Sequence, residues 1–545
     1  MMKATQPLAA LMFVIAAAAS PWSSPSARAD VPTGNWEQAC AALVGPTYPA
    51  DDGVAKVTEA KIVAAGGGKP TAEQMQIYAT RGKVQGVPTQ AVESLPAHCL
   101  VSGYATPNIR FELRLPAQEW NRRMLMVACD GFCGFVFSEA CVPGLMRDYA
   151  TVTSDGGHTA TRNFDGAWGY NNRQAEIDFG YRANHVVAVA AKAILAKFYG
   201  EPPRYSYLTG CSKGGSAGVM AATRYPADFD GIIAGAPVLD YQRKNAIHFP
   251  WVAKAMQSDD DSFLLSPEQL PAIEAAVLGA CDAIDGQADG VIDDPRRCKF
   301  DPASMRCPAG QSSATCLTDK QIEAVRKVYA APRNSRGEIV YPVGTVIGSE
   351  GNWPNWVLPA PPATVTFSRR GAEEYLRYLA FERDPGPSYD FRSFDFDTQL
   401  GQLQAQSAVF DALSTDMRAF RDRGGKIILW HGWGDAAISP LMTIEYYDAL
   451  LKFMGGDRAT HAFARLFLLP GVHHCRGGNG AGLIDALAAL EQWREQQRAP
   501  DVLIATRDDD LDGKIERTRP VYPYPSQASY IGRGDWNDPK NYRPR

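Results

Sequence analysis

The chain has 545 residues, of which 45% are hydrophobic, and its formal net charge is −5. This length permits a large core and favours more than one domain. The slightly acidic balance argues against a nucleic-acid partner, because proteins that bind nucleic acids usually carry a clear excess of basic residues.

The N-terminus has the three parts of a signal peptide. Lys3 supplies a positive charge, residues 8–19 form an apolar run, and Ala27-Arg28-Ala29 is a cleavage motif before Asp30. Residues 1–29 are therefore predicted to be a signal peptide; an N-terminal membrane anchor is the alternative. The run of about 12 residues is too short to span a bilayer as a helix. We expect an exported protein, periplasmic or secreted, with no membrane partner.

The chain contains eleven cysteines, which agrees with export. An exported chain with this many cysteines is expected to carry disulfides, and the odd number leaves at least one of them unpaired. No C-x-x-C pair occurs, so a zinc site is not expected.

Short apolar segments alternate with helical patterns in two parts of the chain. Strands are predicted where such segments run into turns, within residues 121–134, 149–158, 205–209, 229–237, 425–435 and 463–475. A helical pattern covers residues 183–197, and another follows the third predicted strand. This alternation predicts an α/β fold with a parallel sheet.

The stretch from about Leu239 to Asp416 has a different character. Strand–helix alternation fades there, and cysteines, prolines, tryptophans and an acidic loop appear. We interpret residues 30–238 and 417–545 as one catalytic core, and residues 239–416 as a lid domain inserted into it.

The core contains the pattern G-x-S-x-G in "TGCSKGG", formed by Gly210, Ser212 and Gly214. In such motifs a strand turns sharply into a helix and exposes the serine oxygen above the sheet, because the glycines permit a tight turn. Ser212 is therefore predicted to be a nucleophile. The alternative is an ordinary glycine-rich turn between a strand and a helix.

A serine nucleophile needs a general base, and the base needs an acid that orients it. In α/β-hydrolases the chain order is serine, acid, histidine. Asp435 ends one predicted strand, and His473 and His474 follow another and open a glycine-rich loop. The order Ser212, Asp435, His474 fits, whereas His431 lies inside its strand and is predicted to be structural.

Cysteines flank both the nucleophile and the base, since Cys211 precedes Ser212 and Cys475 follows His474. If Ser212 and His474 share a hydrogen bond, their neighbours lie near enough for a disulfide, whose Cα atoms are usually about 4.4–6.8 Å apart. Such a bond would link the two catalytic loops and select His474 over His473. The alternatives are that both cysteines pair elsewhere, or that Cys211 is itself the nucleophile.

With these motifs the chain resembles the tannase/feruloyl esterase family. The residues that carry the resemblance are "TGCSKGG", "HGWGD" and "HHCRGG", and the likeness extends from about Cys40 to Tyr542. It implies an α/β-hydrolase core with a large inserted lid, and hydrolysis of esters of aromatic acids by a Ser-His-Asp mechanism.

Two backbone N–H groups must bind the oxyanion of such a reaction, one after the nucleophile and one from an earlier loop. The first is predicted at Lys213, which replaces the smaller or acidic residue associated with the family. The second is predicted at Gly131, because "CDGFCG" resembles the family's glycine-rich loop, although Asp130 stands where a glycine is expected. The alternative for this loop is a plain turn.

An acidic segment, "CDAIDGQADGVIDDP" at residues 281–295, lies in the predicted lid. Ca²⁺ prefers carboxylate and carbonyl oxygens, and the spacing resembles the calcium loop of the family. The resemblance implies five ligands: the side chains of Asp282, Asp285 and Asp289 and the carbonyls of Gln287 and Val291. The ion would be structural, because serine chemistry needs no metal. The alternative is a solvated acidic loop.

Cys281 and Cys298 bracket the acidic segment and are expected to pair. The resemblance implies two further disulfides, Cys40–Cys99 and Cys307–Cys316. Three cysteines then remain, of which two could bond: Cys129, Cys133 and Cys141.

The triad predicts ester hydrolysis but does not name the ester. "GNWPNW" at residues 351–356 would supply aromatic walls for a phenyl ring, or its tryptophans belong to the core of the lid. A small-molecule ester of a hydroxycinnamic acid, such as a feruloyl ester, is the first expectation, and galloyl esters and terephthalate half-esters are the alternatives. Two other classes stay open, a non-catalytic calcium-dependent binding protein and an exported peptidase.

Overall fold

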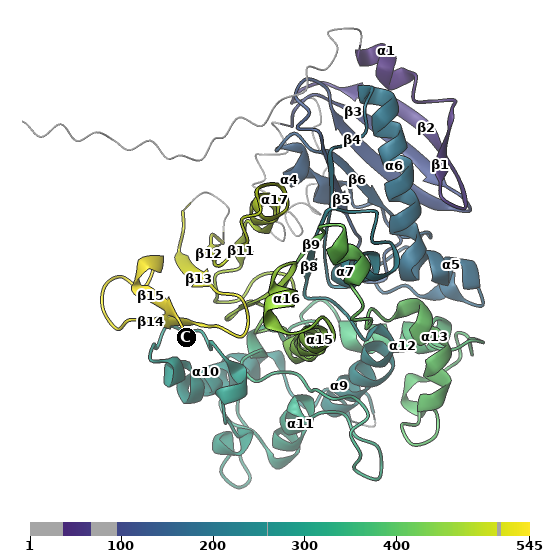
Figure 1. Cartoon of the computed structure of the whole chain (residues 1–545). Coiled ribbons are helices and arrows are strands. Elements are labelled where there is room, and N and C mark those ends of the chain that lie inside the picture. Colours follow the sequence, from purple (N-terminus) through teal and green to yellow (C-terminus); the bar gives the residue numbers. More distant parts are fainter. Residues whose placement is uncertain (1–35, 67–94, 259, 510–513) are drawn as a thin grey trace, which may run out of the picture.

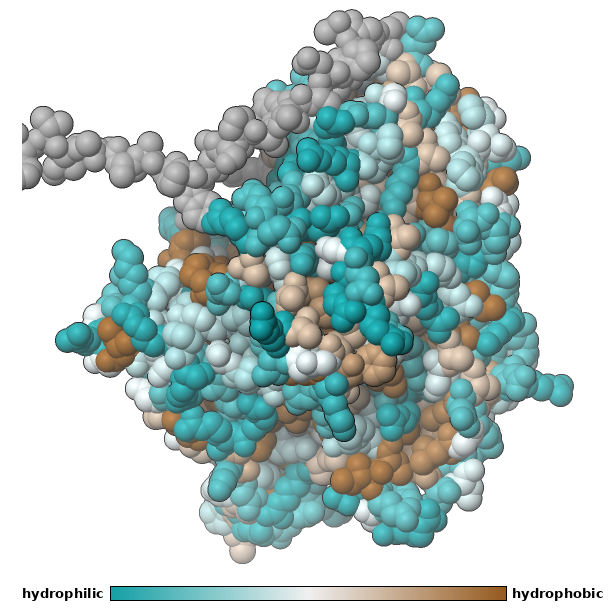
Figure 2. Space-filling view, viewed as in Figure 1, coloured by the Kyte–Doolittle hydropathy of each residue, from teal (hydrophilic) through white to brown (hydrophobic). Residues whose placement is uncertain are grey.

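The structure of the protein is a computed structural model that describes residues 36–66, 95–258, 260–509 and 514–545 (Figure 1). The predicted signal peptide, residues 1–29, lies outside the described residues. Within them, no helix is both long and apolar enough to cross a membrane. The face shown in Figure 2 is mostly hydrophilic, with hydrophobic side chains in small scattered groups, as is usual for folded proteins.

A ten-stranded sheet forms the centre of the core, in the order β1-β2-β3-β4-β6-β5-β7-β8-β9-β10. Strands β5 to β10 pair in parallel with one another, and each lies in a segment predicted to be a strand. The bounds of the strands are β1 Thr47–Ala50, β2 Gly53–Val63, β3 His98–Ala105, β4 Ile109–Pro116, β5 Arg123–Val127, β6 Ala150–Ser154, β7 Tyr205–Cys211, β8 Gly231–Gly235, β9 Lys426–Gly432 and β10 Ala464–Leu469. Two small sheets contain β11 Leu483–Ile484, β12 Leu503–Arg507, β13 Arg517–Val521, β14 Ala528–Tyr530 and β15 Tyr542–Pro544.

The sequence analysis does not predict strands β1 to β4, and for them the expectation of a parallel sheet is wrong. They pair antiparallel with one another, and β4 joins β6 antiparallel. The connections explain this arrangement. Strand β3 ends at Ala105 and β4 begins at Ile109, and so short a link permits only a hairpin, whereas parallel neighbours need a crossover of about a dozen residues or more.

Most of the parallel strands are buried on both faces, which is why β5, β8, β9 and β10 contain apolar runs in sequence, whereas β6 also buries Thr151 and Thr153. In β5, Met124 and Met126 join the core on the face covered by α6, α7 and α15, whereas Leu125 and Val127 join the core on the face covered by α17. The helices of this part of the chain are α1 Trp36–Ala41, α4 Val142–Leu145, α5 Arg173–Ile177, α6 Ala183–Tyr199, α7 Lys213–Arg224, α14 Arg418–Asp422, α15 Pro440–Phe453, α16 Asp457–His461 and α17 Ala486–Gln496.

Between β8 and β9, the described part of residues 236–425 contains none of these strands and folds into helices. Figure 1 shows α9 to α13 gathered below the sheet, at one end of it. Helices α9, α10 and α11 share a hydrophobic core that includes Val252, Ile273, Val325 and Trp353. Helices α12 and α13 pack into a second core, which includes Phe132 and Tyr241. The boundaries given above for the lid and the catalytic core stay a prediction. The helices here are α8 Tyr241–Arg243, α9 Phe249–Met256, α10 Leu270–Cys281, α11 Asp319–Tyr329, α12 Phe367–Tyr378 and α13 Gln404–Phe410.

The described residues form five disulfides: Cys40–Cys99, Cys129–Cys133, Cys211–Cys475, Cys281–Cys298 and Cys307–Cys316. Four of these pairs are the ones expected from the sequence. Among the three cysteines that the sequence leaves open, Cys129 and Cys133 bond, and Cys141 is buried and free.

Candidate active site

Ser212 occupies the turn between β7 and α7, where the G-x-S-x-G motif predicts it. Its backbone angles are φ 59° and ψ −119°, and residues with a side chain seldom adopt a positive φ. A Cβ on Gly210 would lie 2.6 Å from the backbone of Gly214, so this tight turn requires glycine. The strained turn holds the serine at the carboxyl end of the strand, with 9% of the residue exposed.

A disulfide joins this turn to the loop that carries the histidine. Cys211 and Cys475 are 264 residues apart in sequence, and their Cα atoms lie 6.0 Å apart. Ser212 and His474 are their chain neighbours, so the bond brings the backbones of the predicted nucleophile and base together. The Nε2 atom of His474 lies 3.7 Å from the Sγ atom of Cys475 and therefore faces the side of the loop where the disulfide lies.

Asp435 orients His474 from the other side. The buried carboxylate accepts a 2.7 Å hydrogen bond from Nδ1 of His474, and its second oxygen accepts the N–H groups of Ala437 and Ile438 at 2.8 and 2.9 Å. Burial by itself would raise the pKa of Asp435, but the positive charge of protonated His474 and the hydrogen bonds from His431 and His474 hold it well below its usual range. The carboxylate is therefore ionised at neutral pH, as an orienting acid must be.

His431 has a role at this site that the sequence analysis misses. It is predicted to be structural, and it is fully buried, but its Nε2 donates to Asp435 at 3.1 Å and to the carbonyl of Ile438 at 3.0 Å. Its Nδ1 lies 2.8 Å from Oγ1 of Thr443, so the hydrogen-bond network assigns the proton to Nε2. Asp435 thus lies between two histidines. The spacing of His431 and Asp435 in "HGWGD" is the sequence signal that points to this contact.

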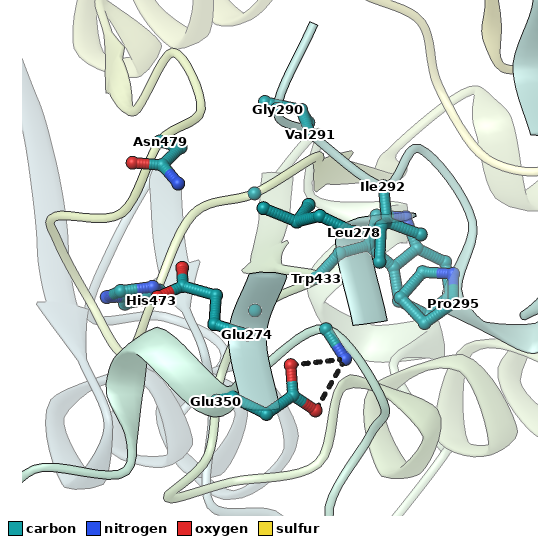
Figure 3. Close-up of a pocket in the computed structure, with 13 residues that line it drawn as sticks. Glu274, Leu278, Gly290, Val291, Ile292, Pro295, Glu350, Trp433, His473 and Asn479 are labelled. Carbon is teal, nitrogen blue, oxygen red and sulfur yellow. Dashed lines mark hydrogen bonds between the residues drawn. The ribbon is translucent and has the colours of Figure 1, made fainter. Parts of the chain in front are cut away.

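The neighbouring His473 faces a different environment. Figure 3 shows it beside Glu274, at a small pocket that Glu350 also lines. The cavity has a volume of about 20 Å³, room for about one water molecule. Burial lowers the pKa of His473 to about 4. Of the two adjacent histidines, both of which the structure describes, only His474 is hydrogen-bonded to Asp435.

Lys213 begins α7, and the first backbone N–H groups of a helix have no intrahelical partner, which leaves its N–H free to bind an oxyanion. The side chain is buried elsewhere. Its Nζ donates to the carbonyl of Gly180 at 3.1 Å and lies 4.9 Å from the centre of the Phe179 ring. Burial lowers the pKa of Lys213 to about 7. The unusual side chain is therefore held by the aromatic core, and the predicted role concerns the backbone alone.

Gly131 lies in the turn after β5 and has a φ of 60°. A Cβ at this position would come within 2.0 Å of Oδ1 of Asn163, so the packing requires glycine. Its carbonyl accepts a 3.3 Å hydrogen bond from the hydroxyl of Tyr241. The contribution of its N–H to an oxyanion hole stays a prediction.

The two tryptophans of "GNWPNW" have different surroundings. Trp353 is fully buried in the core of the lid helices. Trp356 stands edge-on to His474, with 5.3 Å between ring centres and 86° between ring planes. Phe249 and Phe367 adjoin Trp356, at 6.1 and 5.2 Å between ring centres. The motif therefore supplies one tryptophan to the core of the lid and one to an aromatic wall beside the base.

The acidic segment curls around one of its own carboxylates. Asp282 accepts the backbone N–H groups of residues 289–291, at 3.2, 2.9 and 3.3 Å in chain order. Asp285 accepts the N–H of Gln287 at 2.9 Å. The expected ligand residues therefore share one compact loop, which the disulfide Cys281–Cys298 brackets.

Two buried carboxylate oxygens of this loop have no hydrogen-bond partner in the described residues, Oδ1 of Asp289 and Oδ1 of Asp293. Burial raises the pKa of Asp293 well above its usual range; the charge of Arg519 opposes this, and the charges of Asp285 and Asp289 add to it. The other oxygen of Asp289 forms ion pairs with Arg517 and Arg519. The two unpartnered oxygens suit Ca²⁺. The side chains alone do not form a metal centre, since no group of three His, Cys, Asp or Glu in the described chain is arranged to hold a metal.

Comparisons with known proteins show the family of the chain. The family model described as tannase and feruloyl esterase matches residues 94–544. The chain is 36% identical over 531 residues to the mono(2-hydroxyethyl) terephthalate hydrolase of Piscinibacter sakaiensis, covering 83% of this chain and 86% of that protein. It is 31% identical over 421 residues to a probable feruloyl esterase B-2 of Aspergillus flavus, covering 73% and 77%.

Comparison with solved structures points to the same family. The crystal structure of feruloyl esterase B from Aspergillus oryzae matches with a TM-score of 0.78 at 25% identity, over 94% of this chain and 100% of that one. The family match includes strands β3 to β10, the helices between β8 and β9, and the loops of Ser212, Asp435 and His474. The resemblance noted in the sequence motifs is thereby confirmed. The chain belongs to the tannase and feruloyl esterase family, and it is a carboxylic ester hydrolase with an α/β-hydrolase core.

Proposed function

We propose that the protein hydrolyses esters of aromatic acids, of the feruloyl type, through an acyl-enzyme on Ser212. The observation that carries the proposal is the joining of three loops: a disulfide ties the serine turn to His474, and a 2.7 Å hydrogen bond ties His474 to Asp435. Nucleophile, base and orienting acid are the groups that serine ester hydrolysis requires.

Each step follows from one of these roles. Oγ of Ser212 attacks the ester carbonyl while its proton passes to Nε2 of His474, and Asp435 stabilises the imidazolium through Nδ1–H. The N–H groups of Lys213 and Gly131 stabilise the oxyanion. The bond to the alcohol then breaks as His474 returns the proton to the leaving oxygen. Water, deprotonated by His474, attacks the acyl-enzyme and releases the acid and Ser212.

The aromatic wall supports an aromatic acyl group, because the partly exposed Trp356 and Phe367 offer ring faces and edges to a phenyl ring. The buried Phe249 packs against Trp356. Feruloyl esters are the first choice, since feruloyl esterases occur among both the similar sequences and the similar structures. Terephthalate half-esters are the second candidate, which the similarity to a hydrolase of that name favours. Galloyl esters are the third.

The proposal includes an exported location, periplasmic or secreted. Its support is the set of five disulfides, which persist in oxidising compartments and are rare in the cytosol. The signal-peptide pattern of residues 1–29 points the same way.

The proposal also includes a structural Ca²⁺ at the acidic loop. Its ligands would be the side chains of Asp282, Asp285 and Asp289 with the carbonyls of Gln287 and Val291, and its support is the pair of unpartnered buried oxygens nearby. The ion would stabilise the fold and take no part in the chemistry. We expect calcium in elemental analysis and a melting temperature lowered by a chelator and restored by added Ca²⁺. A calcium-free protein whose melting temperature ignores both would show a solvated acidic loop.

The deciding experiment is a rate panel on the purified protein with methyl ferulate, methyl gallate, chlorogenate and a terephthalate half-ester, using Ser212→Ala as control. One preferred ester, lost in the variant, is the expected result and names the acyl group. No activity on any of these esters, with Ser212 still labelled by a fluorophosphonate, would mean a hydrolase with another substrate. No activity and no labelling of Ser212 would favour the non-catalytic binding protein. Cleavage of peptides but not of esters would favour the peptidase.

A further inference from the structure

One side chain between β8 and β9 touches both loops that carry the base and its acid. Oδ1 of Asn352 accepts the backbone N–H of His474 at 3.2 Å and the backbone N–H of Ala436 at 3.1 Å. Ala436 directly follows Asp435 in the chain. A single amide oxygen from the lid therefore bridges the two loops at the point where the 2.7 Å hydrogen bond between His474 and Asp435 forms.

The turn that presents Asn352 is firmly anchored. The N–H of Asn352 donates to the carbonyl of Ser349 at 2.8 Å, and the fully buried Trp353 donates from Nε1 to Oγ of Ser349 at 3.2 Å. Glu350 accepts the hydroxyl of Tyr329 at 2.6 Å and the N–H of Gly348 at 3.0 Å, the latter visible in Figure 3. The amide oxygen is therefore held in place before substrate arrives.

The turn that carries Asn352 also packs against His473, on the other side of the histidine loop. A Cβ on Gly351 would lie 2.8 Å from Oε1 of Glu274 and 3.2 Å from the ring of His473, so there is no room for a side chain there. Figure 3 shows Glu274, Glu350 and His473 around the small pocket described above for His473. Close packing on one side and two hydrogen bonds on the other leave the histidine loop little freedom to shift relative to Asp435.

We propose that Asn352 is a positioning residue for ester hydrolysis, which keeps the imidazole of His474 aligned with Asp435 and Ser212. It does not touch the reacting atoms; it acts through the backbone N–H groups that it holds. Without its oxygen, two partly buried N–H groups lose their acceptor, and the loops keep only their other contacts, such as the 2.8 Å hydrogen bond from the N–H of Gly434 to the carbonyl of Val472. A displacement of about 1 Å in such an alignment costs up to about a hundredfold in rate. The inference rests on the triad proposed above.

The test compares two replacements of nearly equal size. Asn352→Leu removes the acceptor, and Asn352→Asp keeps it. We expect kcat for the preferred ester to fall about 10- to 100-fold in Asn352→Leu with KM changed less than about threefold. In Asn352→Asp we expect kcat within about threefold of the unchanged protein. If leucine is not accommodated in the fold, Asn352→Ala removes the same acceptor with a smaller side chain.

Asn334 supplies a matched control. Its Oδ1 also accepts two backbone N–H groups, those of Arg336 and Glu338 at 3.1 and 2.9 Å, but these belong to an exposed turn of the lid. Asn334→Leu should lower the melting temperature without changing kcat. If Asn352→Leu behaves the same way, or if Asn352→Asp is as slow as Asn352→Leu, Asn352 has only a structural role. Full activity in Ser212→Ala would instead overturn the triad itself, so the two failures are distinguishable.

Discussion

His473 and His474 are neighbours in the chain, yet they face two different buried acidic regions. Asp435, beside His474, receives hydrogen bonds from His431 and His474, and these two histidines hold its pKa well below the usual range against the effect of burial. On the other side, burial raises the pKa of Glu350 to about 7, because its donors are neutral groups.

The difference shows that burying an acid near an imidazole does not by itself make a catalytic pair. A direct hydrogen bond between the two groups is also needed, because it fixes the orientation of the imidazole relative to the acid. His474 has that bond, whereas burial lowers the pKa of His473 to about 4 and leaves its ring neutral at neutral pH.

The largest expected effect tests the two histidines against each other. His474→Gln should lower kcat by about 10⁴-fold or more, because the base that the disulfide ties to the serine turn is lost. His473→Gln should leave kcat within about threefold. Steady-state rates on the preferred ester decide between them. A severe loss in His473→Gln with an active His474→Gln would reverse the assignment of the base.

The acid of the pair is the next test. Asp435→Asn keeps the shape of the side chain but cannot accept from both histidines as a carboxylate does, so the tautomer of His474 is no longer set. We expect kcat to fall by about 10³- to 10⁴-fold with little change in KM. The measurement is kcat in a folded variant, checked by circular dichroism. A decrease below about tenfold would mean that His474 is oriented by other groups.

The disulfide between the two loops should matter for both activity and stability. The double change Cys211→Ala and Cys475→Ala should lower kcat by about 10- to 100-fold and the free energy of unfolding by about 2–4 kcal/mol. The pair Cys307–Cys316, which closes a segment of 9 residues in the lid, is the control. Its double replacement should cost stability but not kcat. Equal activity in both double variants would refute the positioning role of Cys211–Cys475.

The smallest expected effect concerns Glu350, the buried acid on the side of His473. The pKa of Glu350 rises from an ordinary 4.5 to about 7 on folding, so the folded state binds its proton more tightly. That contribution to stability is complete below pH 4.5 and is lost as the pH rises through 7. We would measure the free energy of unfolding in urea at several pH values between about 4.5 and 7. Over this interval it should fall by on the order of 3 kcal/mol more in the unchanged protein than in Glu350→Gln. Parallel curves would mean that Glu350 is ionised in the folded state.

Part of the fold was readable from the sequence because the signal is local. Strands β5, β8, β9 and β10 are largely buried on both faces and therefore contain apolar runs bounded by turns, and β6 is a short buried segment with β-branched residues. Strand β2 is largely exposed and lacks such a run, so it was missed together with the antiparallel strands beside it. The choice of antiparallel pairing depends on loop lengths and on neighbours in space.

Some features of the candidate site were likewise predictable from the sequence, and others were not. The sequence by itself predicted the serine turn, because that turn depends on residue types at fixed spacing. It also predicted the order of Ser212, Asp435 and His474 from the chain order of α/β-hydrolases, and the disulfide from the cysteines beside Ser212 and His474. Only the tertiary structure decided that His431 shares Asp435, that Asn352 bridges the two catalytic loops and that Trp356 rather than Trp353 meets the base. These contacts join side chains far apart in the chain, and their geometry exists only after the sheet and the lid helices have packed together.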